Sequence, residues 1–200
     1  MKRILTVTLA MVFVLSALSS GSALAEPKGN LQIGIGGAQV QGAPMVGLDW
    51  KVPTIHVAAM YFPASWAVLI ADVSYGLPNE YEQTNGTDTD KITVETAYVD
   101  FMAGAVKHFA DGGFFYASLG VAVGWSGLEM SDYDGELTID TGAGFALGAG
   151  MQIPIKNSFM GFATFMQRCI PTELKEDDMS MTMNAGGFEM TAGVAWTFGG

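Results

Sequence analysis

The sequence predicts an all-β fold, an eight-stranded antiparallel up-and-down transmembrane β-barrel. Apolar side chains alternate with small or polar ones along eight separate segments, and this period is typical of strands with one apolar face. With one exception, short and long connections alternate between the segments, as in barrels that cross a membrane. Half of the residues are hydrophobic, yet after residue 25 no apolar run reaches the roughly 18 residues of a spanning helix.

The first 25 residues have the pattern of a cleaved secretory signal peptide. Basic residues precede an apolar stretch over residues 4–18, and Ala25 ends a small-residue cleavage site. We expect residues 26–200 to form one domain. Cleavage removes Lys2 and Arg3 and therefore lowers the net charge from −11 to −13. That charge argues against nucleic acid as a partner, because binding nucleic acid depends on basic side chains.

The first four strands are expected at residues 31–41, 46–62, 66–75 and 93–109. Ile33 and Ile35 give the first strand its apolar face, and Pro53 disturbs the second. In the third and fourth strands, Asp72 and Asp100 lie opposite the apolar side chains. The inner face of a barrel accepts such polar side chains, whereas the outer face meets lipid.

The last four strands are expected at residues 114–126, 138–155, 159–170 and 188–198. The sixth, TIDTGAGFALGAGMQIPI, alternates Phe145 and Leu147 with glycine and polar residues. The seventh is the least regular, because both of its faces are apolar as far as Arg168. We interpret MSMTM, at residues 179–183, as an extension of the last hairpin rather than as a soft-metal site.

The connections differ in length and charge. Tight turns are expected at residues 62–65, 110–113 and 156–158, and long loops at residues 77–92, 127–137 and 171–184. The three long loops hold 12 of the 20 acidic residues. Short periplasmic turns and long extracellular loops are typical of bacterial outer-membrane barrels.

The interior of an eight-stranded barrel is just wide enough to be filled by side chains. The bulky residues Met60, Trp66, Tyr98 and Phe114 are expected to point inward. Glycines on the same face leave room for them, at Gly104, Gly120, Gly124, Gly142, Gly144, Gly148, Gly150 and Gly193. The lumen is therefore expected to be packed rather than open.

Three inward charges are expected at similar heights in the outer half of the barrel, on the sixth to eighth strands. They are Asp140, Arg168 and Glu189. We predict that they form an internal ionic cluster, because an unpaired buried charge is costly. Asp72 and Asp100 have no obvious basic partner in the sequence.

Aromatic side chains are expected to form lipid-facing girdles at both membrane interfaces. Their members are Tyr75 and Trp125 at the loop end, and Tyr61, Phe109, Phe115, Trp196 and Phe198 at the turn end. Catalysis is not expected, because neither His56 nor His108 has a serine close by in a short motif. We expect no cofactor and no metal site.

The signal pattern, the eight alternating segments and the ending FEMTAGVAWTF resemble small outer-membrane β-barrels of the OmpA/OmpX type, over about residues 30–198. The resemblance implies a monomer in the outer membrane of a Gram-negative cell envelope, in contact with lipid and lipopolysaccharide. It also implies that the barrel assembly machinery recognises Phe198 as the final aromatic residue, although Gly199 and Gly200 follow here.

The leading functional hypothesis is a structural or surface-interaction protein with acidic extracellular loops and a side-chain-filled lumen. One alternative is a narrow porin-like channel, if the glycine-rich lumen holds water. Another is a soluble periplasmic β-barrel that binds an apolar ligand. The face assignment also predicts that Leu147→Arg, which places a charge in lipid, impairs assembly far more than a polar change at the lumen-facing Gln152.

Overall fold

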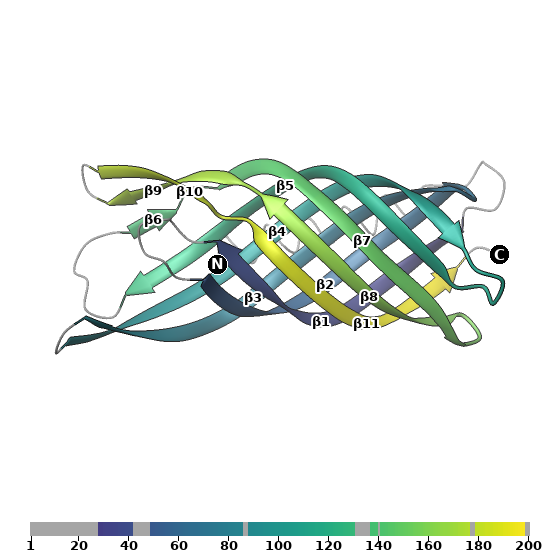
Figure 1. The fold of residues 1–200 in the computed structure, drawn as a ribbon, viewed down its shortest axis with the longest axis horizontal. Helices are drawn as coiled ribbons and strands as arrows, with labels where there is room; N and C mark the ends of the chain where they lie inside the picture. Colours follow the sequence, from purple (N-terminus) through teal and green to yellow (C-terminus); the bar gives the residue numbers. More distant parts are fainter. Residues whose placement is uncertain are drawn as a thin grey trace.

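The computed structural model describes residues 28–41, 49–85, 88–130, 137–139, 141–176 and 179–198. Eight antiparallel strands close into a barrel in the order β1-β11-β8-β7-β5-β4-β3-β2 (Figure 1). The barrel strands are β1 (Lys28–Gln41), β2 (Asp49–Ala64), β3 (Ala67–Asn85), β4 (Asp88–His108), β5 (Phe114–Met130), β7 (Gly142–Lys156), β8 (Phe159–Cys169) and β11 (Gly187–Phe198). The predicted fold class is confirmed.

The barrel closes where its first and last strands pair. Gly29 of β1 lies opposite Phe198 of β11, and the ladder continues to Val40 opposite Gly187. Neighbours in the barrel are otherwise neighbours along the chain, as in an up-and-down barrel. Closure satisfies the backbone groups that an open sheet edge would expose to lipid. The described residues include no helix long and apolar enough to cross a membrane.

Three short strands form a second sheet at one end, which we call the outer end. They are β6 (Leu137–Ile139), β9 (Pro171–Glu176) and β10 (Met179–Asn184), in the order β10-β9-β6. β10 carries the MSMTM sequence and pairs with β9 as a hairpin. The prediction that residues 138–155 form one strand was therefore wrong at its start, because Leu137–Ile139 pairs with β9 rather than continuing into β7.

The prediction of a long loop at residues 77–92 was also wrong. β3 and β4 continue as a paired hairpin as far as Asn85 opposite Asp88. Alternation explains this extension, because Ile92 and Val94 are buried whereas Thr93 between them is half-buried. Figure 1 shows the hairpin projecting beyond the barrel at the outer end.

The two faces of the barrel wall differ as the alternation predicts. On β7, the outward Phe145 and Leu147 are about half exposed, whereas Ala146 and Gly148, which alternate with them, are buried. The same alternation leaves large apolar side chains exposed on other strands of the barrel, including Leu119, Val121 and Val194. In water this surface would be unfavourable; in a bilayer it meets acyl chains.

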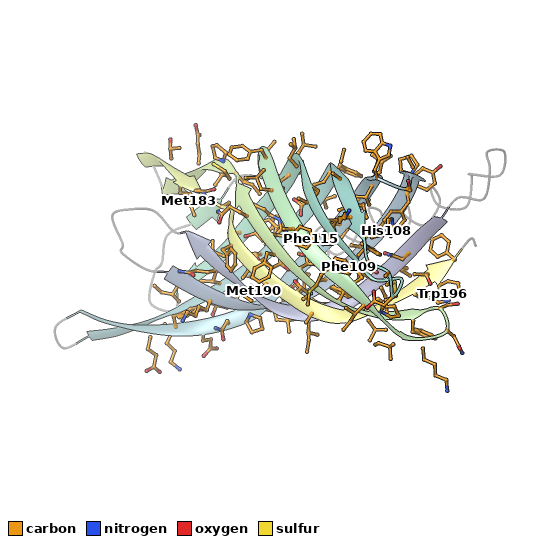
Figure 2. All side chains as sticks on the ribbon, turned by 45° about the vertical axis from the view of Figure 1, so that its right-hand side comes forward. His108, Phe109, Phe115, Met183, Met190 and Trp196 are labelled. Atoms are coloured by element: carbon orange, nitrogen blue, oxygen red, sulfur yellow. The ribbon has the colours of Figure 1, made fainter. Side chains whose placement is uncertain are left out.

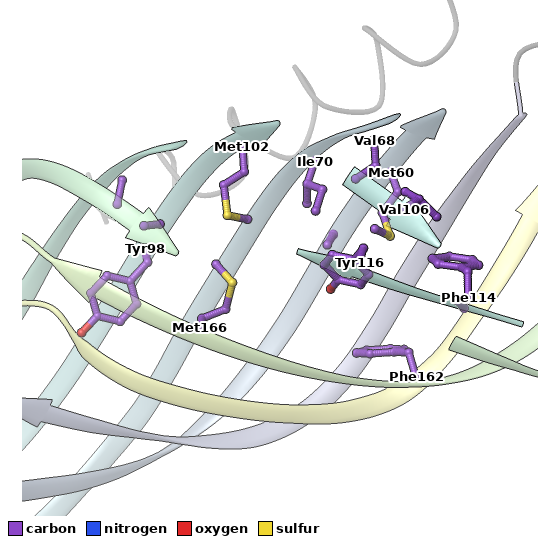
Figure 3. Packing of buried hydrophobic residues seen from close by; sticks show 14 of the residues in the cluster. Met60, Val68, Ile70, Tyr98, Met102, Val106, Phe114, Tyr116, Phe162 and Met166 are labelled. Atoms are coloured by element: carbon purple, nitrogen blue, oxygen red, sulfur yellow. The ribbon is translucent and has the colours of Figure 1, made fainter. Parts of the chain in front are cut away.

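Buried apolar side chains fill the lumen from the turn end to mid-height (Figure 3), among them Met60, Met102, Phe114, Tyr116 and Met166. Trp66, however, was wrongly expected to point inward. It lies in the tight turn between β2 and β3 and is 69% exposed. The alternation of the third segment does not govern Trp66, because this residue precedes the first paired residue of the strand.

Candidate functional site

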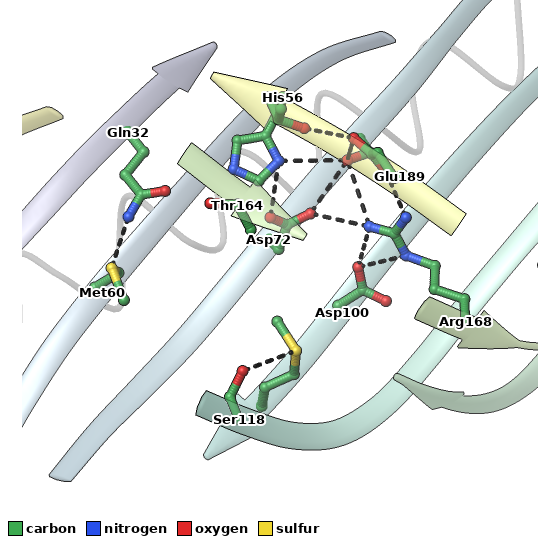
Figure 4. A network of polar contacts seen from close by, with 12 residues as sticks. Gln32, His56, Met60, Asp72, Asp100, Ser118, Thr164, Arg168 and Glu189 are labelled. Carbon is green, nitrogen blue, oxygen red and sulfur yellow. Dashed lines mark hydrogen bonds and ion pairs between the residues drawn. The ribbon is translucent and has the colours of Figure 1, made fainter. Parts of the chain in front are cut away.

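Arg168 forms a charged cluster with three acidic residues across the lumen (Figure 4). Its Nη2 lies 2.6 Å from Oδ2 of Asp100 and 3.5 Å from Oδ1 of Asp72. Its Nη1 donates to Oε2 of Glu189 at 2.5 Å, and its Nε donates to Asp100 at 2.8 Å. All four side chains are almost fully buried. Each charge thus has an ionic partner at close range, which offsets part of the cost of burial.

The partners of Arg168 come from distant parts of the barrel wall. Arg168 is on β8 and Glu189 is on the adjacent β11, whereas Asp72 and Asp100 face each other on β3 and β4. In the closed order, β7 and β5 separate β8 from β4. The guanidinium therefore connects opposite walls and occupies the lumen at this height.

Small side chains make room for the cluster. Arg168 is paired across strands with Ala146, and Asp100 with Ala122; both alanines are fully buried. The Tyr98 ring covers the guanidinium, with Cζ of Arg168 4.5 Å from the ring centroid. Tyr98 also donates a 2.8 Å hydrogen bond from its hydroxyl to the carbonyl of Ala185. The alanines leave space for the guanidinium, and the aromatic face attracts it.

His56 and Ser74 extend the cluster toward β2. Nδ1 of His56 lies 3.0 Å from Oδ2 of Asp72 and 3.5 Å from Oγ of Ser74. Ser74 donates to Oε1 of Glu189 at 2.9 Å. A hydrolase triad needs the acid on one imidazole nitrogen and the serine on the other. Here both approach Nδ1, and no described residue forms a hydrogen bond with Nε2, so the arrangement does not match a hydrolase triad.

An uncharged polar group lies nearer the turn end of the lumen. Asn30 of β1 donates from Nδ2 to Oε1 of Gln152 of β7 at 3.0 Å. The amide nitrogens of Gln32 and Gln152 both donate to Sδ of Met60. The two contacts of Gln152 connect β7 with β1 and β2, which are not its neighbours in the barrel. Side chains thus cross the lumen at two separate heights.

Several buried polar atoms have no hydrogen-bond partner among the described residues: Oδ1 of Asn30, Oγ1 of Thr54, Nε2 of His56, Oγ1 of Thr96 and Oδ1 of Asp100. Within the described ranges, no group of three or more His, Cys, Asp or Glu side chains has a geometry that could hold a metal ion.

The structure brings together two of the three residues proposed for the ionic cluster, Arg168 and Glu189. The third, Asp140, lies outside the described residues. The interpretation that Asp72 and Asp100 have no basic partner was wrong, because Arg168 reaches both of them. These contacts depend on the relative heights of the side chains on distant strands, which sequence alternation does not specify. Likewise, strand pairing places Ser74 beside His56, a neighbour that no short motif reveals.

The residues proposed for the aromatic girdles lie near both ends of the barrel. Tyr75 and Trp125 flank Ala97 on adjacent strands toward the outer end. Phe109, Phe115 and Trp196 lie nearer the turn end and are each about half exposed. Tyr61 and Phe198 also lie nearer the turn end and are partly exposed. Figure 2 shows His108, Phe109 and Trp196 far from Met183 of β10. The free thiol of Cys169 on β8 is partly buried.

A closed antiparallel barrel with an apolar exterior and polar side chains inside defines the class of outer-membrane β-barrel proteins. The chain belongs to the outer membrane protein beta-barrel domain family, which matches residues 5–198. This membership confirms the resemblance noted from the sequence and implies an outer-membrane location. No curated protein sequence matches the chain.

Solved structures share the fold. OprG from Pseudomonas aeruginosa has a TM-score of 0.68 at 8% identity, covering 88% of this chain and 98% of that one. Neisserial surface protein A has a TM-score of 0.61 at 12% identity, covering 85% and 97%. Ail of Yersinia pestis, in complex with the heparin analogue sucrose octasulfate, has a TM-score of 0.57 at 18% identity, covering 86% and 99%. These similarities show the fold alone.

Proposed function

We propose that this chain is a structural or surface-interaction protein of the outer membrane, with a lumen closed by its own side chains. The observation that carries this proposal is the cluster around Arg168. One guanidinium contacts carboxylates on β3, β4 and β11 within 3.5 Å. Charged groups held this closely across a narrow barrel leave little space for a solute to pass.

The outer end supports a role in binding partners at the cell surface. Glu80 and Glu82 of the β3–β4 hairpin and Glu173 of β9 have exposed side chains, and the whole chain carries a net charge of −11. Ail shares the fold, but a sulfated ligand such as the one in its complex would be repelled by these carboxylates. The charge favours a cationic partner instead.

The same proposal includes export of the protein and its insertion into the outer membrane. The signal peptide is cleaved after Ala25, and the barrel assembly machinery then recognises the strand that ends at Phe198. The mature barrel is a monomer whose apolar exterior contacts outer-membrane lipid and lipopolysaccharide. The apolar exterior and the filled interior argue against the soluble barrel with an apolar ligand.

A narrow channel is a second candidate function. It is favoured by the unpaired buried polar atoms of Asn30, Thr54 and Thr96, since such atoms bind water when space allows. A continuous file of water along these side chains would carry small ions past the cluster.

Single-channel recording in planar bilayers separates the two functions. The full mature chain is refolded in detergent, its insertion is verified by flotation of proteoliposomes, and current is recorded over a range of voltages. A closed lumen predicts no discrete current steps from wild-type protein. Reproducible steps with one conductance would instead support the channel.

A further inference from the structure

The β3–β4 hairpin carries an open strand edge above the barrel. β3 pairs with β2 only as far as Gly76 opposite Thr54, whereas its pairing with β4 continues to Asn85. Among the described residues, positions 79–85 of β3 therefore pair on one side only. At about 3.3 Å per residue, this edge is about 23 Å long. Figure 1 shows the hairpin projecting away from the β6-β9-β10 sheet.

A bulge near Pro78 ends the pairing of β3 with β2, and two side-chain hydrogen bonds hold the base of the hairpin in place. The register between β3 and β4 shifts just before Asn79, and such a bulge bends and twists a strand. Pro78, at the shift, has no backbone N–H to offer a neighbouring strand. Asn79 donates from Nδ2 to the carbonyl oxygen of Lys51 of β2 at 3.0 Å, and the Tyr81 hydroxyl donates to the same oxygen. The base of the hairpin is thus tied to the barrel.

The two faces of the edge strand have different chemistry. Glu80 and Glu82 are exposed and share one face, since successive side chains of a strand alternate. Tyr81 lies on the other face, opposite the buried Ile92 of β4. A strand added beside β3 would place its own side chains in the same alternation.

We propose that residues 79–85 of β3 bind an extended, basic peptide segment of a partner protein as an additional strand. Its backbone pairs with the open edge, its basic side chains lie beside Glu80 and Glu82, and its apolar side chains lie beside Tyr81. This mode is β-strand addition, in which the backbone supplies affinity and the alternate side chains supply specificity. The inference rests on the surface role proposed above and names the partner's chemistry.

A second copy of this chain is the less favourable occupant of the same edge. Pairing of two β3 edges would bring glutamates of one copy close to those of the other, and like charges opposite each other destabilise a sheet. Acidic side chains on an edge strand commonly prevent such self-association. The basic side chains of a lysine- or arginine-rich strand would instead be attracted to the glutamates of β3.

The test uses the full mature chain in nanodiscs of phosphatidylcholine, a lipid without net charge. The probe is a fluorescent eight-residue peptide of alternating lysine and valine, and binding is followed by anisotropy. Two further peptides carry N-methyl groups on every second backbone nitrogen, one on the lysines and one on the valines. Each removes the donors from one edge of the peptide without changing its charge.

We expect the unmethylated peptide to bind, and one of the two methylated peptides to bind at least tenfold more weakly. Equal binding of all three peptides would show attraction by charge alone and overturn the strand-addition proposal, as would no binding of any peptide. A glutamate–valine peptide of the same length serves as the acidic control and is expected not to bind.

A matched pair of variants locates the site. Glu80→Lys changes an exposed acid on the edge, and Glu173→Lys makes the same charge change on β9. The proposal expects at least tenfold weaker binding for Glu80→Lys and less than a twofold change for Glu173→Lys. Equal losses would place the peptide elsewhere and overturn the assignment to β3. Current steps in the planar-bilayer recording would contradict the closed lumen only, so the two proposals fail separately.

Discussion

Arg168 of β8 and Asp100 of β4 face each other across the lumen, and two nitrogens of the guanidinium donate to one carboxylate oxygen at 2.8 and 2.6 Å. The other oxygen of Asp100 accepts no hydrogen bond from the part of the chain that the structure describes. The arginine is therefore held by a single oxygen of Asp100, together with Glu189 and Asp72. Its contacts link four strands of the barrel wall, so the cluster is expected to contribute to stability as well as to closure.

Replacement of the arginine tests that contribution. Arg168→Met leaves three buried carboxyl groups without a cationic partner other than His56 nearby, and breaking a buried ion pair typically costs about 3–5 kcal/mol. We expect a loss of this size in the free energy of unfolding, measured by urea titration in lipid vesicles. An unchanged midpoint would contradict the importance of the cluster.

Simultaneous neutralisation is the control for this variant. With Asp72→Asn, Asp100→Asn and Glu189→Gln added to Arg168→Met, Arg168 and its three acidic partners are all replaced by uncharged side chains. Because replacing a whole buried ionic group is often close to neutral in stability, most of the lost stability should return. A quadruple variant less stable than Arg168→Met would show that packing, rather than charge, dominates.

The lipid-facing assignment is tested by the depth dependence of arginine on β7. Leu147 is 51% exposed at mid-height and Ile155 is 62% exposed near the turn end. Arginine on the lipid face costs about 2–4 kcal/mol at the bilayer midplane and about 0–1 near the interface. We expect Leu147→Arg to reduce folding yield in vesicles far more than Ile155→Arg. Similar yields for both variants would contradict a lipid contact at Leu147.

The close contacts between β7 and β8 predict a difference between two glycines. A methyl group at Gly144 would overlap the backbone carbonyl of Cys169, whereas at Gly161 its nearest contact is an ordinary 3.5 Å with Ile155. We expect Gly144→Ala to destabilise the barrel by about 1–3 kcal/mol and Gly161→Ala to have little effect. Thermal unfolding on semi-native gels measures both, and equal stabilities would contradict this packing.

The sequence predicts the barrel well because alternation reports directly on two environments. Leu147 and Gly148 are assigned to opposite faces from the pattern alone, and the structure places them there. The pairing of Arg168 with Glu189 can be predicted from the sequence for a related reason, since both lie on inner faces of the last two barrel strands.

What alternation does not specify is the offset between distant strands. Asp72 and Asp100 reach Arg168 because of the stagger accumulated around the barrel, which no local pattern encodes. Trp66 was misplaced because a turn interrupts the period of two. The β3–β4 hairpin was read as a loop because its many acidic and polar residues obscured the alternation that buries Ile92.

The most direct test of a lumen filled by the protein's own atoms is the reactivity of a thiol at mid-height. Ser118 is buried and lies between Gly104 and Gly148 on the neighbouring strands, and Ser118→Cys in a Cys169→Ser background changes its size little. We expect a small, water-soluble thiol reagent to leave Cys at this position unmodified in the folded barrel and to modify it fully in urea. Modification of the folded protein at a rate close to that in urea would contradict a closed lumen.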